Sequence, residues 1–112
     1  MQGETDRLVA MAHKLAIMPD PRELDVLLAT GEQVTIALLS ILLMELGCQA
    51  RSYTGSQVKI ITDNVHNKAR IVKIDRDKIK TDLDSGKIVV IAGFQGVDEH
   101  GNVTTLGRGG SD

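Results

Sequence analysis

The chain has 112 residues, of which 42% are apolar and 25% charged, and its formal net charge is −2. This length provides one modest hydrophobic core, and the composition is that of a soluble globular domain rather than a disordered or fibrous chain. Tyr53 and Phe94 are the only aromatic residues. A nucleic-acid partner is therefore excluded, because it would require clustered Lys and Arg and an aromatic stacking platform.

The sequence predicts a cytoplasmic protein that does not enter a membrane. Cys48 is the single cysteine, so no internal disulfide can form, and a reducing compartment is the simplest setting. The first ten residues carry charges where a secretory signal would be apolar. The longest apolar run, "IALLSILLM" at 36–44, is about half of the ~20 residues that a bilayer requires.

Two helices are predicted in the first half of the chain. In "ETDRLVAMAHKLAI" (4–17), Leu8, Met11, Ala12 and Leu15 share one helical face. The segment at 19–47 then carries a proline near its start, a long apolar stripe and a glycine at its end.

Gly31 interrupts this second helix. Glycine costs roughly 1 kcal/mol relative to alanine inside a helix, so we expect a break or kink around Thr30–Glu32.

Short β-branched segments after Gly47 predict strands. They lie at 50–54, 58–62, 69–74 and 87–94. A short helix over 75–86 is expected to be capped by Asp75 and closed by Gly86. The strand "KIVVIAGF" at 87–94 is almost continuously apolar, which predicts burial on both faces. A hairpin or excursion over 96–107 is centred on Gly101 and Asn102.

This order of elements predicts an α/β fold, either doubly wound or sandwich-like. A parallel sheet needs helices on both faces, and the opening helix has no strand before it. We therefore expect the chain to be the middle of a larger domain.

The segment "GRGGSD" is the first candidate site. Its glycines, Gly107, Gly109 and Gly110, would let the backbone approach a ligand closely. Arg108 could grip a carboxylate with two hydrogen bonds, Ser111 could add a hydroxyl, and Asp112 could hold a lysine or bind Mg²⁺ indirectly. A flexible surface turn explains this glycine-rich segment equally well.

Glu32 is the second candidate, because an acid beside a strongly apolar helix could bind a substrate ammonium group. Taken alone, a helix-terminal charge favourable to the dipole is the better explanation. His13, His66 and His100 lack the spacing of metal ligands, so no metal site is predicted.

Several segments together resemble bacterial aspartokinases of the amino acid kinase superfamily. They are "RELDVLLATGEQVTIALL", "KARI", and "AGFQG" followed by "TTLGRGGSD". The resemblance runs over essentially all 112 residues. It implies a partial three-layer α/β/α sandwich with a mainly parallel sheet, in which residues 1–112 form one partial domain.

The resemblance also implies an activity and its ligands. Aspartokinases transfer the ATP γ-phosphoryl group to the β-carboxylate of L-aspartate with Mg²⁺, giving 4-phospho-L-aspartate. This reaction is the first step toward lysine, threonine and methionine.

By motif match, the aspartate would contact Thr5 in "GETDRL". Glu32 would bind its α-amino group and Arg108 its α-carboxylate. Gly109, Gly110 and Ser111 would surround the reacting groups, and Asp112 would order catalytic lysines; Ser111 and Asp112 are thus the expected catalytic residues. Gly31 would let the Glu32 carboxylate reach the substrate.

The sequence also departs from the family pattern. The family begins with a strand and a "KFGGTS" loop, and it continues past "GRGGSD" into a nucleotide-binding half and regulatory domains. Where the family commonly has "TGWQAG", this chain reads "TGSQVK", so the role of Ser56, Val58 and Lys59 is in doubt.

We therefore expect an internal fragment that alone is inactive and binds neither ATP nor Mg²⁺ tightly. The alternative is a non-catalytic binding or assembly module. Bare apolar faces predict self-association of this chain, and the complete enzyme is expected to be a homo-oligomer.

Overall fold

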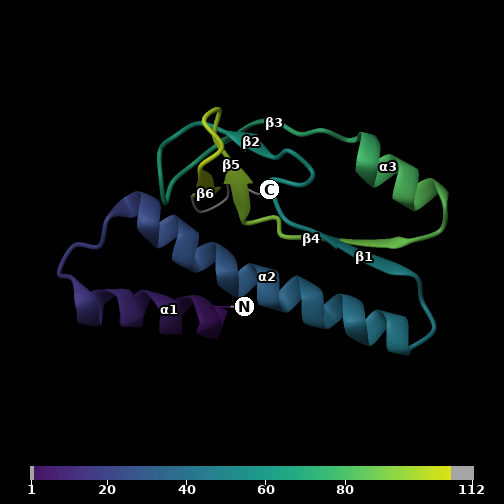
Figure 1. The fold of residues 1–112 in the computed structure, drawn as a ribbon, viewed down its shortest axis with the longest axis horizontal. Helices are drawn as coiled ribbons and strands as arrows, with labels where there is room; N and C mark the ends of the chain where they lie inside the picture. Colours follow the sequence, from purple (N-terminus) through teal and green to yellow (C-terminus); the bar gives the residue numbers. More distant parts are fainter. Residues whose placement is uncertain (1, 107–112) are drawn as a thin grey trace.

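A computed structural model describes residues 2–106 of the chain, with side chains from Thr5 onward. The predictions for Arg108, Gly109, Gly110, Ser111 and Asp112 lie outside the described residues. The described part has extents of 47 × 29 × 22 Å, and Figure 1 shows its elements in chain order. The elements are α1 (Gln2–Leu15), α2 (Pro21–Glu45), β1 (Ala50–Tyr53), β2 (Ile61–Thr62), β3 (Ile71–Lys73), α3 (Asp77–Asp84), β4 (Ile88–Ile91), β5 (Gln95–Val97) and β6 (Val103–Thr105).

The strands form two small sheets among the described residues. In the first, β1 and β4 pair in parallel, with Ala50 opposite Ile88 and Tyr53 opposite Ile91. The second has the order β3-β2-β5-β6. Its β2 and β5 are parallel, whereas the chain neighbours β2/β3 and β5/β6 are antiparallel. Strands distant in sequence thus pair in parallel, and the expected α/β fold class is confirmed.

Helix α2 is the longest element, and it packs against β1, β4 and β6, with α1 on its other side (Figure 1). Its first turn is capped by Asp20, whose carboxylate accepts the Glu23 N–H at 3.0 Å. Pro21 occupies the first helical turn, where no N–H is needed. Gly47, at a φ of +91°, follows the helix end in the left-handed conformation that glycine adopts most easily.

The predicted break at Thr30–Glu32 is wrong, because α2 is continuous through Gly31. The helix packs on strands of both sheets. That packing outweighs the roughly 1 kcal/mol penalty of a helical glycine. Gly31 is therefore placed in the helix by tertiary contacts.

Helix α1 is present as predicted; on its shared apolar face Leu8 is buried but Leu15 is exposed, because the packed part of the face does not extend to the helix end. The predicted start of α3 needs a small correction. Helix α3 begins at Asp77 with Arg76 at the N-cap position, although Asp75 Oδ1 still accepts the Asp77 N–H at 3.0 Å. The end of α3 is as predicted, with Gly86 at a φ of +84°.

Strand β4 is not buried on both faces as predicted. Ile88 is 41% exposed, and Val89, Val90 and Ile91 are half-buried. Within the described residues β4 pairs only with β1, so its other edge and part of its surface have no cover. Its apolar sequence suits a strand with neighbours on both sides, which this part of the chain does not supply.

The core is small and aliphatic apart from one tyrosine. Tyr53, Val58 and Ile60 form its buried centre. The Tyr53 hydroxyl donates a hydrogen bond to Asp82 and so ties α3 to β1. This contact, together with burial, raises the pKa of Tyr53.

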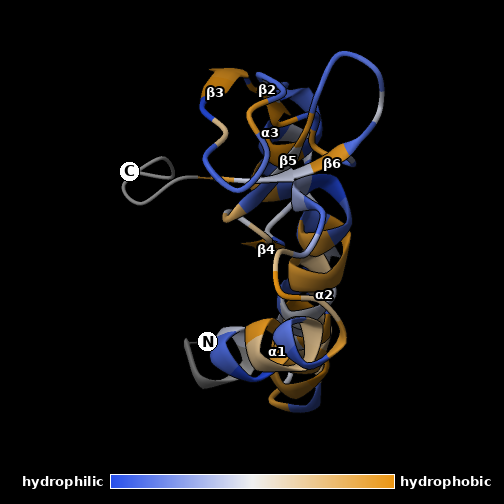
Figure 2. Ribbon diagram, turned by 90° about the vertical axis from the view of Figure 1, so that its left-hand side faces the viewer, coloured by the Kyte–Doolittle hydropathy of each residue, from blue (hydrophilic) through white to orange (hydrophobic). Residues whose placement is uncertain are grey.

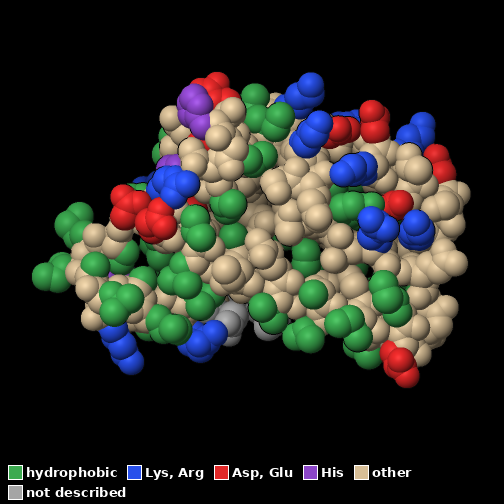
Figure 3. Space-filling view, viewed as in Figure 1, with side chains coloured by type: hydrophobic (Ala, Val, Ile, Leu, Met, Phe, Trp, Pro, Cys, Tyr) green, Lys and Arg blue, Asp and Glu red, His purple; other side chains and the backbone are tan. Residues whose placement is uncertain are grey.

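Much of α2 is orange in the hydropathy colouring of Figure 2. Figure 3 shows apolar side chains gathered over α1 and α2, whereas Lys and Arg gather towards β3 and α3. By length and composition alone, α2 could cross a membrane, and only 17% of its most apolar window is buried. However, Asp25 and Glu32 on this helix bind backbone groups of the strand-rich half, so α2 packs as part of the α/β fold.

Candidate functional site

The candidate site is a cavity of about 510 Å³ between α1, α2 and the end of β4. Apolar side chains form most of its wall, with two carboxylates and two hydroxyl groups among them. The lining residues are Thr5, Asp6, Leu28, Gly31, Glu32, Thr35, Ile36, Leu39, Val90, Ile91 and Phe94. An apolar hollow with a few polar groups is the usual form of a small-molecule site.

Glu32 is one of two acidic side chains that line this cavity, the other being Asp6. Its Oε2 accepts the backbone N–H of Phe94 at 2.7 Å. Burial raises the pKa of Glu32, although the hydrogen bonds from the Phe94 N–H and the Gln95 side chain act in the opposite direction. None of the described lining residues is a Lys, Arg or His. The cavity therefore presents a partly desolvated carboxylate, which favours a cationic ligand group.

Two of the predicted site residues meet in this cavity. Thr5 comes from α1 and Glu32 from α2, and both line the same hollow despite their separation in sequence. Gly31 also lines it, directly before Glu32. The prediction that this glycine breaks the helix is wrong, and its expected role in letting the Glu32 carboxylate reach the substrate stays a prediction.

The segment "AGFQG" after β4 makes contacts that sequence reasoning missed. Gln95 is buried, and its side-chain amide links α2 to the loop at 54–59. Gly55 lies so close to this segment that a Cβ atom on it would be 2.5 Å from the Gln95 carbonyl oxygen. The motif had contributed only to the family resemblance. The one feature of the sequence that could have indicated these contacts is the amide side chain of Gln95, which stands among apolar residues and near two glycines.

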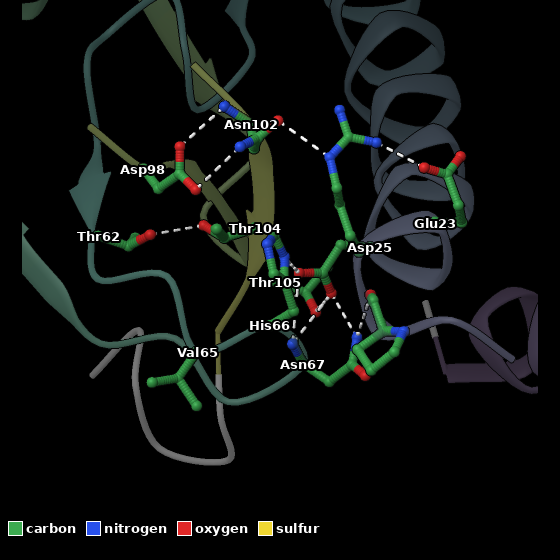
Figure 4. A network of polar contacts seen from close by, with 12 residues as sticks. Glu23, Asp25, Thr62, Val65, His66, Asn67, Asp98, Asn102, Thr104 and Thr105 are labelled. Atoms are coloured by element: carbon green, nitrogen blue, oxygen red, sulfur yellow. Dashed lines mark hydrogen bonds and ion pairs between the residues drawn. The ribbon is translucent and has the colours of Figure 1, made fainter. Parts of the chain in front are cut away.

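A second missed feature is the buried carboxylate of Asp25, shown in Figure 4. It accepts the Asn67 backbone N–H at 3.1 Å and hydrogen bonds from the Asn67 side chain and the Thr105 hydroxyl. The His66 Nδ1 lies 2.6 Å from its Oδ2. Asp25 is 0% exposed, and these partners make its burial tolerable. It fastens the 63–69 loop and β6 to the first turns of α2.

The upper part of Figure 4 shows how the β5–β6 hairpin is attached. Asn102 Oδ1 accepts a hydrogen bond from Arg22 Nε of α2 at 3.0 Å. Burial raises the pKa of Asp98, but hydrogen bonds from Asn102 and the His100 N–H outweigh it and lower the pKa. The hairpin predicted at Gly101 and Asn102 is present.

The loop "TGSQVK" lies beside a second cavity of about 550 Å³. Lys59, Lys73 and Arg76 line it, but so do Asp75 and Asp77. The mixed charges give no preference for an anion or a cation. Within the part of the chain that the structure describes, no group of three or more His, Cys, Asp or Glu side chains could hold a metal ion.

Comparison with known protein families places the chain in a known class. The sequence model that describes the amino acid kinase family matches residues 2–112, and the chain therefore belongs to that family. The predicted resemblance is thus confirmed at the level of the family.

Within the family, the chain is similar to aspartate kinases. The aspartate kinase of Pseudomonas putida is 62% identical over 112 residues, which are all of this chain and 27% of that protein. The crystal structure of aspartate kinase from Synechocystis matches with a TM-score of 0.75 and 48% identity, covering 96% of this chain and 17% of that one.

E. coli aspartokinase III, in complex with aspartate and ADP, matches with a TM-score of 0.74 and 25% identity, covering 98% of this chain and 25% of that one. The chain thus spans about a quarter of the length of the Pseudomonas relative.

Proposed function

We propose that the protein carrying this chain is an aspartate kinase and that these residues supply much of its aspartate site. The proposal is supported by the aspartate kinase relatives, one of which is described with aspartate and ADP bound. The observation that carries it is the Glu32 carboxylate, which lies with Thr5 in a cavity whose described lining contains no Lys, Arg or His. An α-ammonium group is the ligand that such a carboxylate favours.

The remaining roles follow from the family pattern. Thr5 contacts the aspartate, Arg108 takes its α-carboxylate, and Gly109, Gly110 and Ser111 surround the reacting carboxylate. Asp112 orders the lysines that neutralise the phosphoryl group. In this arrangement the protein positions the reactants and stabilises developing charge, which is most of what phosphoryl transfer requires.

In the reaction, a β-carboxylate oxygen of L-aspartate attacks the γ-phosphorus of ATP. The bond between that phosphorus and the β,γ-bridging oxygen breaks, so the products are 4-phospho-L-aspartate and ADP. Glu32 neither gains nor loses a proton during the reaction, because it binds the ammonium group and takes no part in bond formation.

The cavity at Glu32 does not fit the nucleotide or its metal ion. The cavity at Glu32 has no Lys or Arg in its lining to neutralise a triphosphate, and no described cluster of acidic side chains suits Mg²⁺. We therefore assign no step of the reaction to a metal held by this chain, and we place ATP and Mg²⁺ on the rest of the enzyme. This division makes the isolated 112-residue chain inactive.

We also place the enzyme in the cytoplasm, at the start of lysine, threonine and methionine synthesis. We propose neither nucleic acid nor a membrane as its partner.

The test is an assay of ADP release by the full-length protein with L-aspartate, L-glutamate, N-acetyl-L-glutamate and succinate as acceptors. We expect turnover with L-aspartate well above turnover with the other three. Equal or absent turnover with L-aspartate would contradict the proposal and favour a non-catalytic assembly module. The isolated chain serves as the inactive control.

A further inference from the structure

The motif "AGFQG" at 92–96 contains a polar side chain in an unusual place. Gln95, the first residue of β5, is only 3% exposed. A buried amide is costly unless both its oxygen and its nitrogen have hydrogen-bond partners. The hydrogen-bond partners of Gln95 therefore identify the parts of the fold that its side chain connects.

Both ends of the Gln95 amide are engaged, and they bind two different parts of the fold. Its Oε1 accepts the Gly55 N–H at 3.2 Å, in the loop after β1. Its Nε2 donates to the Ala29 carbonyl oxygen of α2 at 3.1 Å. Gly55 has no room for a side chain at this contact, because a Cβ there would lie 2.5 Å from the Gln95 carbonyl oxygen. Gln95 thus connects three segments: the loop after β1, the start of β5, and α2.

These two hydrogen bonds of Gln95 lie directly beside Glu32. Ala29 and Glu32 are three residues apart and so are neighbours on one face of α2. The residue before Gln95 is Phe94, whose N–H donates to Glu32 Oε2 at 2.7 Å. The Gln95–Ala29 hydrogen bond therefore fixes the distance between the helix that carries Glu32 and the backbone that holds its carboxylate. The Gln95 side chain also acts to lower the pKa of Glu32, against the effect of burial.

We propose that Gln95 is a positioning residue for substrate recognition: it holds the Glu32 carboxylate in the orientation that binds the ammonium group of the acceptor. This inference rests on the proposed function, because it takes the acceptor to be an amino acid. Gln95 does not contact the acceptor and acts only through Glu32 and the Phe94 N–H.

The test compares two ligands that differ only in the ammonium group. In the full-length enzyme, the KM for L-aspartate reports binding with the ammonium group. The inhibition constant of succinate, which has both carboxylates and no ammonium, reports binding without it. Neither constant depends on how much of a variant is folded, so a loss of stability alone moves neither one.

Two variants of Gln95 are informative. Gln95→Met keeps the length of the side chain and removes both hydrogen bonds, and Gln95→Leu removes them with a branched apolar side chain of similar size. We expect each to raise the aspartate KM about tenfold, the effect of weakening one hydrogen bond to a charged group. The succinate inhibition constant should stay within about twofold, and Gln33→Met, at an exposed site on α2, should change neither constant.

The inference is overturned if the aspartate KM does not change in either Gln95 variant, or if the succinate constant rises in step with it. Recovery of both variants only as insoluble protein would also overturn it, since Gln95 would then serve folding alone. Failure of the proposed function is a separate result, because the unmodified enzyme would then not phosphorylate L-aspartate at all.

Discussion

At the scale of single residues, Glu32 shows a conflict between stability and ligand binding. Burial raises its pKa above the ordinary value of 4.5. The protonated carboxyl is therefore favoured by folding, and its contribution to stability is present below pH 4.5. That contribution is lost as the pH rises through the raised pKa. At neutral pH the unliganded protein holds a partly buried charge that a bound cation would offset.

A first prediction follows for Glu32→Gln. The glutamine remains neutral and can still accept the Phe94 N–H, so the variant should unfold at a higher temperature than the parent at pH 7. The gain should shrink at pH 4, where the parent carboxyl is protonated more often. Thermal unfolding at both pH values measures this, with the exposed Glu99→Gln as control. A lower unfolding temperature at pH 7 would contradict the account of Glu32.

Lys59 provides a second prediction at this scale. Its φ is +50°, a left-handed conformation, at the position where the family resemblance implies the last glycine of "TGWQAG". Lys59→Gly removes the steric cost of this conformation, about 1–2 kcal/mol, and adds a smaller entropy cost. We expect a net gain of about 0.5–1 kcal/mol in the free energy of unfolding. Lys73→Gly, in strand β3, should instead lose stability, and denaturant unfolding that ranks the two variants in the opposite order would refute this reading.

At the scale of elements, the packing of β5 against β2 depends on a glycine. A Cβ on Gly96 would lie 2.5 Å from Thr62 Cγ2 and 2.7 Å from the Ile60 carbonyl oxygen. Gly93, two residues after β4, has nothing within 4 Å of such an atom. The two glycines of one motif therefore differ in what surrounds them.

We predict that Gly96→Ala costs about 2 kcal/mol or more of the free energy of unfolding, because strands β2 and β5 must separate to admit the methyl group. Gly93→Ala should change stability by less than about 0.5 kcal/mol. Urea unfolding of both variants measures the difference. Equal losses would mean that the close approach of the two strands is not what Gly96 provides.

Local patterns were sufficient to predict most elements of this fold, because helical periodicity, β-branched runs and terminal glycines act over a few residues. The predicted break at Gly31 failed because distant strands hold α2 straight. The predicted burial of β4 failed because a strand's cover depends on its neighbours rather than its own sequence.

The site was predictable only in part, for the same reason. Glu32 and Thr5 were found through a family resemblance rather than through a local pattern. Asp25 and Gln95 were missed because each binds partners more than 35 residues away, and nothing adjacent in sequence marks such contacts.

At the scale of the whole molecule, α2 presents an uncovered apolar stripe. Leu38 and Ile41 are 61% and 63% exposed, and Val34 and Leu42 are also exposed on the same helix. Contiguous apolar surface of this kind is uncommon on monomers. The predicted self-association of this chain remains a prediction, and this stripe is the surface on which we expect it to depend.

Sedimentation velocity over a range of concentrations tests it. The isolated chain should show a sedimentation coefficient that rises with concentration, whereas the double variant Leu38→Glu/Leu42→Glu should stay monomeric. Lys78→Gln/Lys80→Gln, on α3, changes the net charge by the same amount and is the control for the change in charge. A chain that remains monomeric at high concentration would contradict the prediction.

The central claim is that this chain binds the ammonium group of aspartate through Glu32, and one measurement tests it most directly. It is the KM for L-aspartate of Glu32→Gln in the full-length enzyme, determined together with the KM for ATP. We predict a rise of at least tenfold for L-aspartate, because a charge-assisted contact is lost, and a change within about twofold for ATP. An unchanged KM for L-aspartate would contradict the claim.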